Sequence, residues 1–324
     1  MRIAFAILAA VAALAATPAA AQFKAPEHKA DWPGMVSGPS GIEGLDPGPE
    51  LQRGRSAKAM LADSRKLGVA LNALQPQRKA VVDAYVVAVA LDSDPVFGRE
   101  AREAGKVLSR RFDAAGRTVV LAGSAGTLPS ELPNGSLSSL ALALARVAEV
   151  MDKEQDVLVL YTTSHGAPVG IAYHDGDEGY GILSPKRLEA LLDELGIKNR
   201  VLILSACYSG IFVGPLSSPD TALFTAASSD RPSFGCMADN DWTFFGDAMI
   251  NHALRKNQPL EKASDEARMM ISDWESAARL NPSNPQVSIG DHVATWLAPL
   301  EARMPKTDTP PVGRPATDVL KRRG

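Results

Sequence analysis

Apolar positions along the chain follow two alternating patterns, and their order predicts a layered α/β domain. Continuous apolar runs rich in β-branched residues are typical of strands buried on both faces of a parallel sheet. Five such runs occur, at residues 84–91, 118–122, 156–161, 200–205 and 222–226. Apolar residues between them recur every three or four positions, as in amphipathic helices, over 97–112, 137–151 and 185–195. Strands that alternate with helices predict a mainly parallel sheet covered on both faces.

The regions outside this alternation are less regular. Residues 22–80 form an N-terminal extension that is rich in Gly and Pro at first and carries a helical pattern over 51–75. This helix could be a cap, a propeptide or an added element, and the pattern does not decide between them. Two more helices are expected near 243–256 and 260–279. The domain is expected to span 81–302, and residues 303–324, rich in Pro, Lys and Arg, are expected to form a flexible tail.

The first 21 residues have the layout of a secretory signal peptide. Arg2 precedes a short apolar run, and Ala19-Ala20-Ala21 provides a small-residue cleavage site. The run is shorter than a transmembrane helix requires, and no later segment is long and apolar enough to span a membrane. A periplasmic or secreted protein is therefore expected, with no membrane span in the mature chain.

Composition and charge narrow the classes of partner. Of 324 residues, 45% are apolar and 22% charged, as in ordinary globular proteins, and the formal net charge is −3. Nucleic acid is not expected as a partner because its phosphates require a basic surface. A polar cluster at His174, Asp175, Asp177 and Glu178 lacks the spacing of a calcium loop and is expected to be solvated. No metal site and no bound cofactor are predicted.

The chain contains two cysteines, Cys207 and Cys236. Exported domains often pair their cysteines, so a disulfide between them is one possibility. The other is a reactive thiol at Cys207, since the sequence Ala-Cys-Tyr-Ser-Gly at 206–210 is not typical of an apolar core. Cys236 is then a structural residue of a neighbouring loop.

Reactive side chains follow two of the predicted strands. His165 comes after the third strand and Cys207 after the fourth, 42 residues later, a spacing that one crossover explains. Ligands of open parallel sheets bind beyond the carboxyl ends of the strands, where the two residues would meet. A thiolate nucleophile and an imidazole that protonates the leaving amine are the requirements of a thiol hydrolase. Gly166 leaves room for substrate, and its N–H and that of Cys207 are candidate oxyanion donors.

The local sequence around these residues resembles the legumain-type cysteine peptidases, family C13, which are relatives of the caspases. The resemblance is carried by Thr-Ser-His-Gly at 163–166 and Ser-Ala-Cys-Tyr-Ser-Gly at 205–210. Further matches lie at 225–231, 233–236, 244–247 and 284–286, so that the similarity spans about residues 82–290. It is greatest to the bacterial exported branch of the family.

This resemblance implies a caspase-like three-layer α/β/α sandwich with a mainly parallel central sheet. It also implies a dyad of Cys207 and His165, with cleavage after Asn or sometimes Asp. For the pocket that receives this side chain, the family pattern places an acid at Asp247 and, more loosely, an arginine at Arg99. The residues that the resemblance assigns to substrate binding are Asp247, Arg99, Ser205, Asp230 and Ser233.

Two positions depart from the legumain pattern. Ser164 stands where legumain has Asp before the catalytic His, and Ser205 stands where it has Glu two residues before the catalytic Cys. The second change removes an acid from the pocket. Asp230 could simply pair with Arg231 on a loop, and a helix dipole would also explain Asp247.

Three functions fit these observations. The leading interpretation is a cysteine endopeptidase that hydrolyses a peptide or protein substrate through an acyl-enzyme. A transamidase or peptide ligase would use the same dyad, with an amine in place of water. A catalytically silent binding module of the same fold is the third, and the presence of both His165 and Cys207 counts against it.

Overall fold

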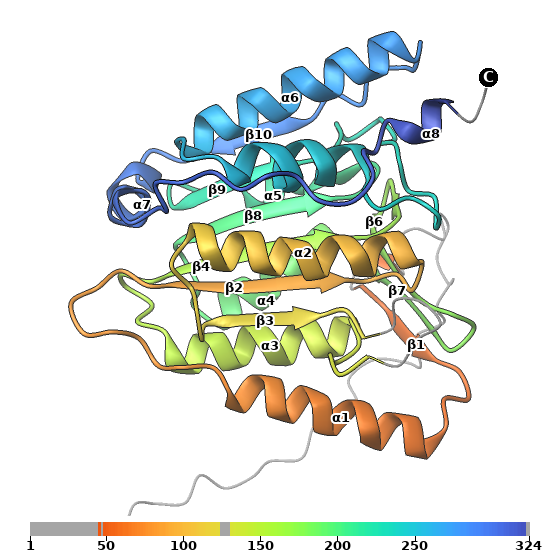
Figure 1. Cartoon of the computed structure of the whole chain (residues 1–324). Helices are drawn as coiled ribbons and strands as arrows, with labels where there is room; N and C mark the ends of the chain where they lie inside the picture. The colour runs from red at the N-terminus through yellow and green to blue at the C-terminus, as the bar shows by residue number, and fades with distance from the viewer. Residues whose placement is uncertain (1–44, 47, 124–129, 322–324) are drawn as a thin grey trace, which may run out of the picture. The chain divides into compact units, whose positions relative to one another are not determined.

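The computed structural model describes residues 45–46, 48–123 and 130–321. The predicted signal peptide and the first part of the extension therefore lie outside the described residues. A six-stranded sheet forms the centre of the domain, with strand order β10-β9-β8-β4-β2-β3 (Figure 1). Its strands are β2 (Ala84–Ala90), β3 (Thr118–Leu121), β4 (Val157–Thr163), β8 (Arg200–Ser205), β9 (Thr221–Thr225) and β10 (Gln286–Ile289). Only β10, at one edge, runs antiparallel to its neighbour.

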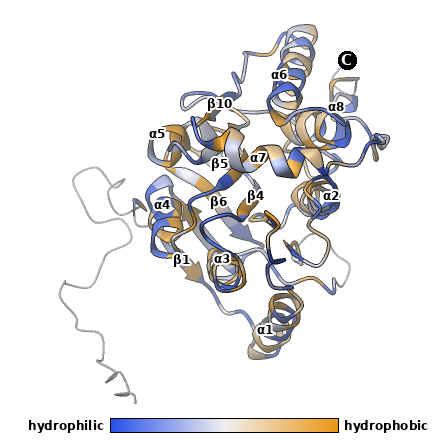
Figure 2. Ribbon diagram, turned by 90° about the vertical axis from the view of Figure 1, so that its left-hand side faces the viewer, coloured by the Kyte–Doolittle hydropathy of each residue, from blue (hydrophilic) through white to orange (hydrophobic). Residues whose placement is uncertain are grey.

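Successive side chains of each central strand point into different cores, as the two-residue period of a strand requires. In β2, Val86 and Ala88 belong to one apolar cluster, whereas Val87 and Val89 belong to the other. The first cluster includes residues of α2 (Pro95–Arg111), the π-helix η3 (Gly246–His252), α6 (Leu260–Ala277) and α7 (Val293–Ala302). The second includes residues of α1 (Ala57–Asn72), α3 (Leu137–Val150), α4 (Pro185–Glu194), the 3-10 helix η2 (Ser209–Phe212) and α5 (Val213–Leu216). The three-layer α/β/α sandwich with a mainly parallel sheet is thereby confirmed (Figure 2).

A second, smaller sheet was not predicted from the sequence. It is antiparallel, with strand order β1-β7-β6-β5. Its strands are β1 (Glu50–Gln52), β5 (Gly166–Ala167), β6 (Gly170–Asp175) and β7 (Gly179–Leu183). Since β5 begins directly after His165, this sheet extends the carboxyl edge of the large one beside the candidate histidine.

The described part of the N-terminal extension packs onto the domain. Helix α1 begins after Ser56, whose side chain accepts a hydrogen bond from the N–H of Ala59. Leu67 and Leu74 are buried in the core that α3 shares. Arg55 pairs with Asp175 in the β6–β7 turn, and β1 pairs with β7. The predicted helix is confirmed over a shorter range than 51–75, because residues 50–52 form a strand instead.

The predicted flexible tail is ordered as far as residue 321. The tail packs against the 3-10 helix η4 (Ala253–Arg255) and the π-helix before it. It ends in α8 (Asp318–Lys321). The indole N–H of Trp242 donates to the carbonyl of Val312 at 2.8 Å, and Ala316 is buried. The Pro-rich composition suggested fraying, but its backbone groups find partners on the domain, which the local sequence does not reveal.

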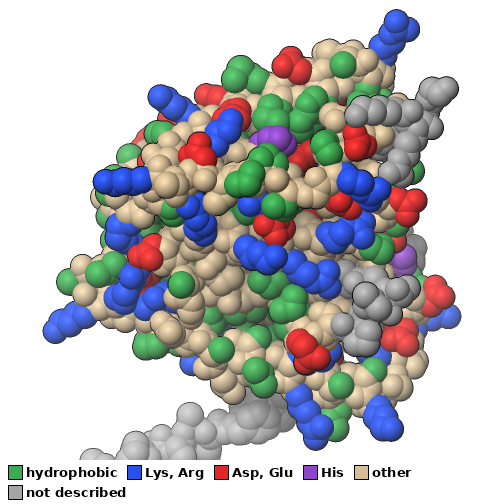
Figure 3. All heavy atoms as spheres, in the orientation of Figure 1, with side chains coloured by type: hydrophobic (Ala, Val, Ile, Leu, Met, Phe, Trp, Pro, Cys, Tyr) green, Lys and Arg blue, Asp and Glu red, His purple; other side chains and the backbone are tan. Residues whose placement is uncertain are grey.

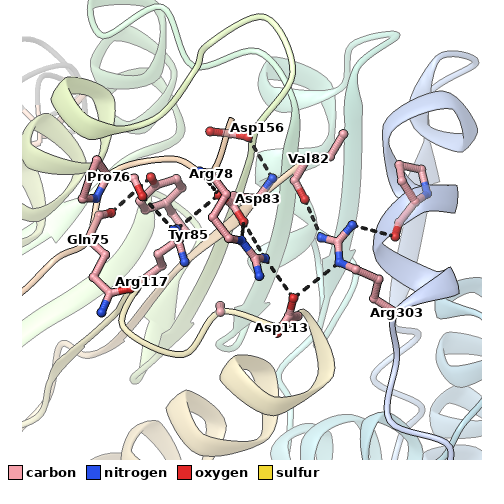
Figure 4. A network of polar contacts seen from close by, with 12 residues as sticks. Gln75, Pro76, Arg78, Val82, Asp83, Tyr85, Asp113, Arg117, Asp156 and Arg303 are labelled. Atoms are coloured by element: carbon pink, nitrogen blue, oxygen red, sulfur yellow. Dashed lines mark hydrogen bonds and ion pairs between the residues drawn. The ribbon is translucent and has the colours of Figure 1, made fainter. Parts of the chain in front are cut away.

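Buried charges fix the amino ends of the central strands, at the edge opposite the candidate site (Figure 4). Asp83, which precedes β2 and is fully buried, accepts from Arg78 at 2.7 Å and pairs with Arg117 at 3.3 Å. The N–H of Asp83 donates to Asp156, which precedes β4, at 2.8 Å. These contacts set the mutual register of β2 and β4, and through it the position of their carboxyl ends.

The face shown in Figure 3 has Lys and Arg side chains interspersed with Asp and Glu. Among the described residues, no helix combines the length and the apolar character that crossing a membrane requires.

Candidate active site

The sheet brings His165 and Cys207 to the same edge. β4 and β8 are parallel neighbours, and their last paired residues are Thr163 and Ser205. His165 and Cys207 each stand two positions beyond this pair. The predicted adjacency of the two strands is therefore observed, and the carboxyl ends of both strands carry the two reactive side chains.

Gly166 lies directly against the backbone of Cys207. A Cβ atom at position 166 would stand 2.0 Å from the carbonyl oxygen of Cys207 and 3.0 Å from its nitrogen, distances that no side chain can occupy. The sequence predicted that the absence of a side chain at Gly166 leaves room for substrate. In the structure, the absence of this side chain lets the loop that carries His165 approach the backbone of Cys207.

Hydrogen-bond donors surround the sulfur of Cys207. The N–H of Ser233 donates to Sγ at 3.2 Å, and the hydroxyl oxygen of Ser233 lies 3.6 Å from it. The thiol of Cys236 also bonds to Cys207 and is the largest cause that lowers the pKa of Cys207 to about 6. Burial opposes this shift, while Ser233 and the charge of His165 add to it. Cys207 is thus held largely as a thiolate at neutral pH, the form that acts as nucleophile.

Cys207 and Cys236 are both free thiols, so the disulfide alternative is not realised in the structure. The hydrogen bond to Cys207 and burial raise the pKa of Cys236 well above its usual range. The two thiols therefore differ in character, with Cys236 the donor and Cys207 the acceptor. The sequence assigned Cys236 a structural role, and its contact with the sulfur of Cys207 was missed.

Tyr208, the residue after the cysteine, has a left-handed backbone conformation with φ of 59°. Such a conformation is uncommon for a residue with a large side chain. Its N–H donates to the carbonyl of Arg231 at 2.9 Å, which fastens the turn to the loop that also carries Ser233. The turn after β8 thus projects the thiol beyond the end of the sheet.

His165 is half exposed and lies between an aromatic ring and a carboxylate. The edge of its ring contacts Phe97 at 5.0 Å between centroids, in a T-shaped arrangement. Its Nε2 stands 3.5 Å from a carboxylate oxygen of Asp94, the residue that caps α2. Asp92, two residues earlier, is buried, and burial is the largest cause that raises its pKa. Phe97 and Asp94 thus contact the imidazole from two elements and orient it, with one carboxylate beside Nε2.

A fully buried carboxylate lies beneath the site. One oxygen of Glu100 accepts hydrogen bonds from Thr163 at 2.7 Å and from Ser205 at 3.1 Å. The other accepts from the N–H and the hydroxyl of Thr243, at 2.8 and 2.9 Å. Glu100 therefore joins the ends of β4 and β8 to the loop before η3, and fixes the two strands that carry the dyad.

Comparison with known proteins assigns the family of this region. Residues 138–295 match the family model described as the Peptidase C13 family. This stretch of the chain is similar to that family. The resemblance to legumain-type peptidases is thereby confirmed over this range, and with it a function of the cysteine-peptidase type.

A solved structure, that of caspase-1 from Spodoptera frugiperda, is similar at 12% sequence identity and a TM-score of 0.42. The match covers 66% of this chain and 91% of that chain. A search of the curated proteins finds no match.

Not all of the predicted pocket residues lie around the thiol of Cys207. Ser233 contacts Cys207, as described above. Asp230 points to solvent, where it accepts from Ser228 and pairs with Arg231. Ser205 is buried and turned toward Glu100 and Thr243.

Asp247, the predicted acid of the substrate pocket, makes its contacts inside the protein. Its side chain is fully buried, and its oxygens accept from Asn251 at 2.8 Å and from the N–H of Ala316 at 2.7 Å. Asp247 therefore binds the C-terminal segment within the protein. The family motif suggested the pocket role, but a contact with a residue 69 positions later cannot be read from it.

Arg99 is also engaged in internal contacts. Its guanidinium donates to the carbonyls of Ala238 and Asn240, and it stands 3.6 Å from Asp241. The arginine thus holds the loop that follows Cys236.

An apolar pocket of about 470 Å³ has His165 among its lining residues. Its walls come from β6, β7 and the segment of β1, and include Ala172, Ile182 and Leu51. Cys207 is not among its lining residues. The pocket was not predicted, because its walls belong to the small sheet that the sequence pattern did not reveal.

Proposed function

We propose that this protein is an exported cysteine endopeptidase that acts through Cys207 and His165. The observation that carries the proposal is the hydrogen-bonded thiol of Cys207 at the end of β8, whose pKa of about 6 keeps it ionised at neutral pH. The imidazole of His165 follows the end of β4, the neighbouring strand. A structural cysteine would be expected in apolar surroundings, where burial keeps the thiol protonated. The match to the Peptidase C13 family supports the same reading.

The chemistry proceeds in two stages. The thiolate of Cys207 attacks the scissile carbonyl, and the N–H groups of Gly166 and Cys207 stabilise the negative charge on its oxygen. The imidazolium of His165 protonates the amine as the C–N bond breaks, which leaves an acyl-enzyme. His165, now neutral, takes a proton from water, whose oxygen attacks the thioester and releases the acid, which restores the thiolate of Cys207 and the imidazolium of His165.

Asp94 acts on this reaction as a positioning residue. One of its carboxylate oxygens lies 3.5 Å from Nε2 of His165, so that it orients the imidazole that must meet the leaving amine.

The proposal includes cleavage after Asn or Asp, a preference that is tested separately from the activity itself. Asp247 cannot supply the recognising acid, since its oxygens bind Asn251 and Ala316. Arg99 is the one basic residue among the predicted pocket residues, and part of its side chain is exposed. A peptide series with Asn, Asp, Gln and Ala at this position measures the preference directly.

The decisive experiment compares the wild-type chain without residues 1–21 against Cys207→Ala and His165→Ala. Each is assayed on a peptide library under reducing conditions. The proposal expects turnover by wild type only, with loss of activity after iodoacetamide. Folded wild-type protein that binds peptides yet cleaves none, equally with Cys207→Ala, would favour the binding module. Peptide joining in place of hydrolysis would identify the transamidase.

A further inference from the structure

The pocket beside His165 has the character of a binding site for an apolar side chain. Its volume of about 470 Å³ lies within the range of small-ligand sites and exceeds that of one large side chain. Ala172, Ile182 and Leu51 supply apolar surface. Leu51 keeps 37% of its surface exposed, so an occupant of the pocket can reach its side chain.

The polar groups of the pocket are engaged with one another or with the protein. Asp92 is buried, accepts from the N–H of Asp94 at 2.8 Å, and lies 3.5 Å from His174. The hydroxyl of Tyr173 accepts a hydrogen bond from Gln52 at 3.2 Å. Apart from the half-exposed rings of His165 and His174, the walls offer few free partners to a polar occupant, whereas an apolar occupant gives up no hydrogen bonds with water on entering.

The position of the pocket relative to the dyad identifies which part of a substrate would enter it. In the acyl-transfer reaction, the sulfur of Cys207 binds the acyl half of the substrate, and the imidazole of His165 faces the leaving amine. The pocket borders His165 and not Cys207. A side chain that reaches it therefore belongs to the leaving half, C-terminal to the scissile bond.

We propose that this pocket binds an apolar side chain, such as Leu or Phe, of the residue just C-terminal to the scissile bond. The inference rests on the proposed function and adds to it a preference on the leaving side. It also gives the segment around β1 a role in substrate binding, because Leu45, Pro49 and Leu51 line the pocket. This segment is then a wall of the site, held by the pairing of β1 with β7, and removal of it would weaken activity on such substrates.

The kinetic test uses peptides that differ only in the residue after the scissile bond, with Leu, Gly and Asp compared. Burial of a leucine side chain predicts a kcat/KM for Leu about 10- to 100-fold above that for Gly, and Asp no better than Gly. Leu51→Asp places a charge in the pocket wall and should bring the Leu-to-Gly ratio close to one, whereas Leu51→Met should retain it. Met269→Asp is the matched control, since Met269 is 62% exposed on α6 and lies outside the pocket.

A binding test separates failure of this inference from failure of the proposed function. Peptides that begin with Leu or Gly, which correspond to the released halves, are titrated into Cys207→Ala, followed by calorimetry. Tighter binding of the Leu peptide that Leu51→Asp abolishes supports the pocket, even if the wild type proves to lack peptidase activity.

Turnover with a Leu-to-Gly ratio near one, and equal binding of the two peptides, would overturn the pocket and leave the peptidase standing.

Discussion

Replacement of Cys236 by alanine should raise the pKa of Cys207 without touching either member of the dyad. The hydrogen bond from Cys236 is the largest cause of the low value of about 6, so its loss removes the strongest support of the thiolate. Ser233 and His165 remain and hold part of the shift. Cys236→Ser is the matched comparison, because its hydroxyl can donate in place of the thiol and is the better donor.

Hydrogen bonds to charged groups contribute about 1.5–3 kcal/mol, and one pKa unit corresponds to about 1.4 kcal/mol. A thiol is a weak donor, so we take the lower end and expect an increase of about one unit. At pH 6 the thiolate fraction would fall from about one half to about one tenth. A more basic thiolate is intrinsically more nucleophilic, so at pH 9 the alanine variant should react about threefold faster than the serine variant. The two rate profiles are therefore expected to cross.

The assay is the rate of iodoacetamide addition between pH 4.5 and 9.5, followed by intact mass. Cys207 is the only thiol in both variants, since the chain has two cysteines, so each adduct reports on one site. Because the pKa of Cys207 is depressed, the rate should fall as the pH drops through it, and the midpoint should lie higher in the alanine variant. Coincident midpoints for Cys236→Ala and Cys236→Ser would refute the hydrogen-bond account.

Three further outcomes follow from the same site. Gly166→Ala should abolish turnover, because its Cβ would overlap the carbonyl of Cys207; full activity with an unchanged circular dichroism spectrum would contradict the close approach. Glu100→Ala should lower the free energy of urea unfolding by about 3 kcal/mol or more, because it leaves buried donors such as the N–H of Thr243 without an acceptor. A loss under about 1 kcal/mol would argue against the hydrogen-bond network around Glu100. Asp247→Asn should lower the free energy of unfolding by about 1–3 kcal/mol. The relative kcat/KM values across the Asn, Asp, Gln and Ala peptide series should stay unchanged, whereas altered values would support a role of Asp247 in the substrate pocket.

The large sheet was predictable because its strands are buried on both faces. Continuous apolar runs such as the one in β2 have few other interpretations, and β2 begins where predicted and ends one residue earlier, at Ala90. The small sheet escaped because β5 has two residues and β7 contains two glycines, so neither shows an apolar alternation. β10 is short and only partly buried, which removes the same signal.

The dyad was predictable because its position depends on strand order alone. The residues around it were not, since their roles depend on contacts between distant segments. Glu100 is the exception, for it falls on the apolar stripe of α2, three residues after Phe97 and four before Ala104. A charged residue in such a stripe requires internal partners, and this signal could have identified it.

The strand order of the large sheet has a consequence for any attempt to isolate the catalytic part of the chain. The region similar to the C13 family begins at residue 138, yet β2 lies between β3 and β4, and both β2 and β3 come from earlier in the chain. A fragment limited to 138–295 would expose the bare flank of β4, a template for pairing with other copies. It would also lack Asp94 and Glu100, which hold His165 and the ends of β4 and β8. The stretch of sequence that marks the family is therefore not a unit that can fold and act by itself, and the shortest autonomous version must include the βαβ unit that precedes it.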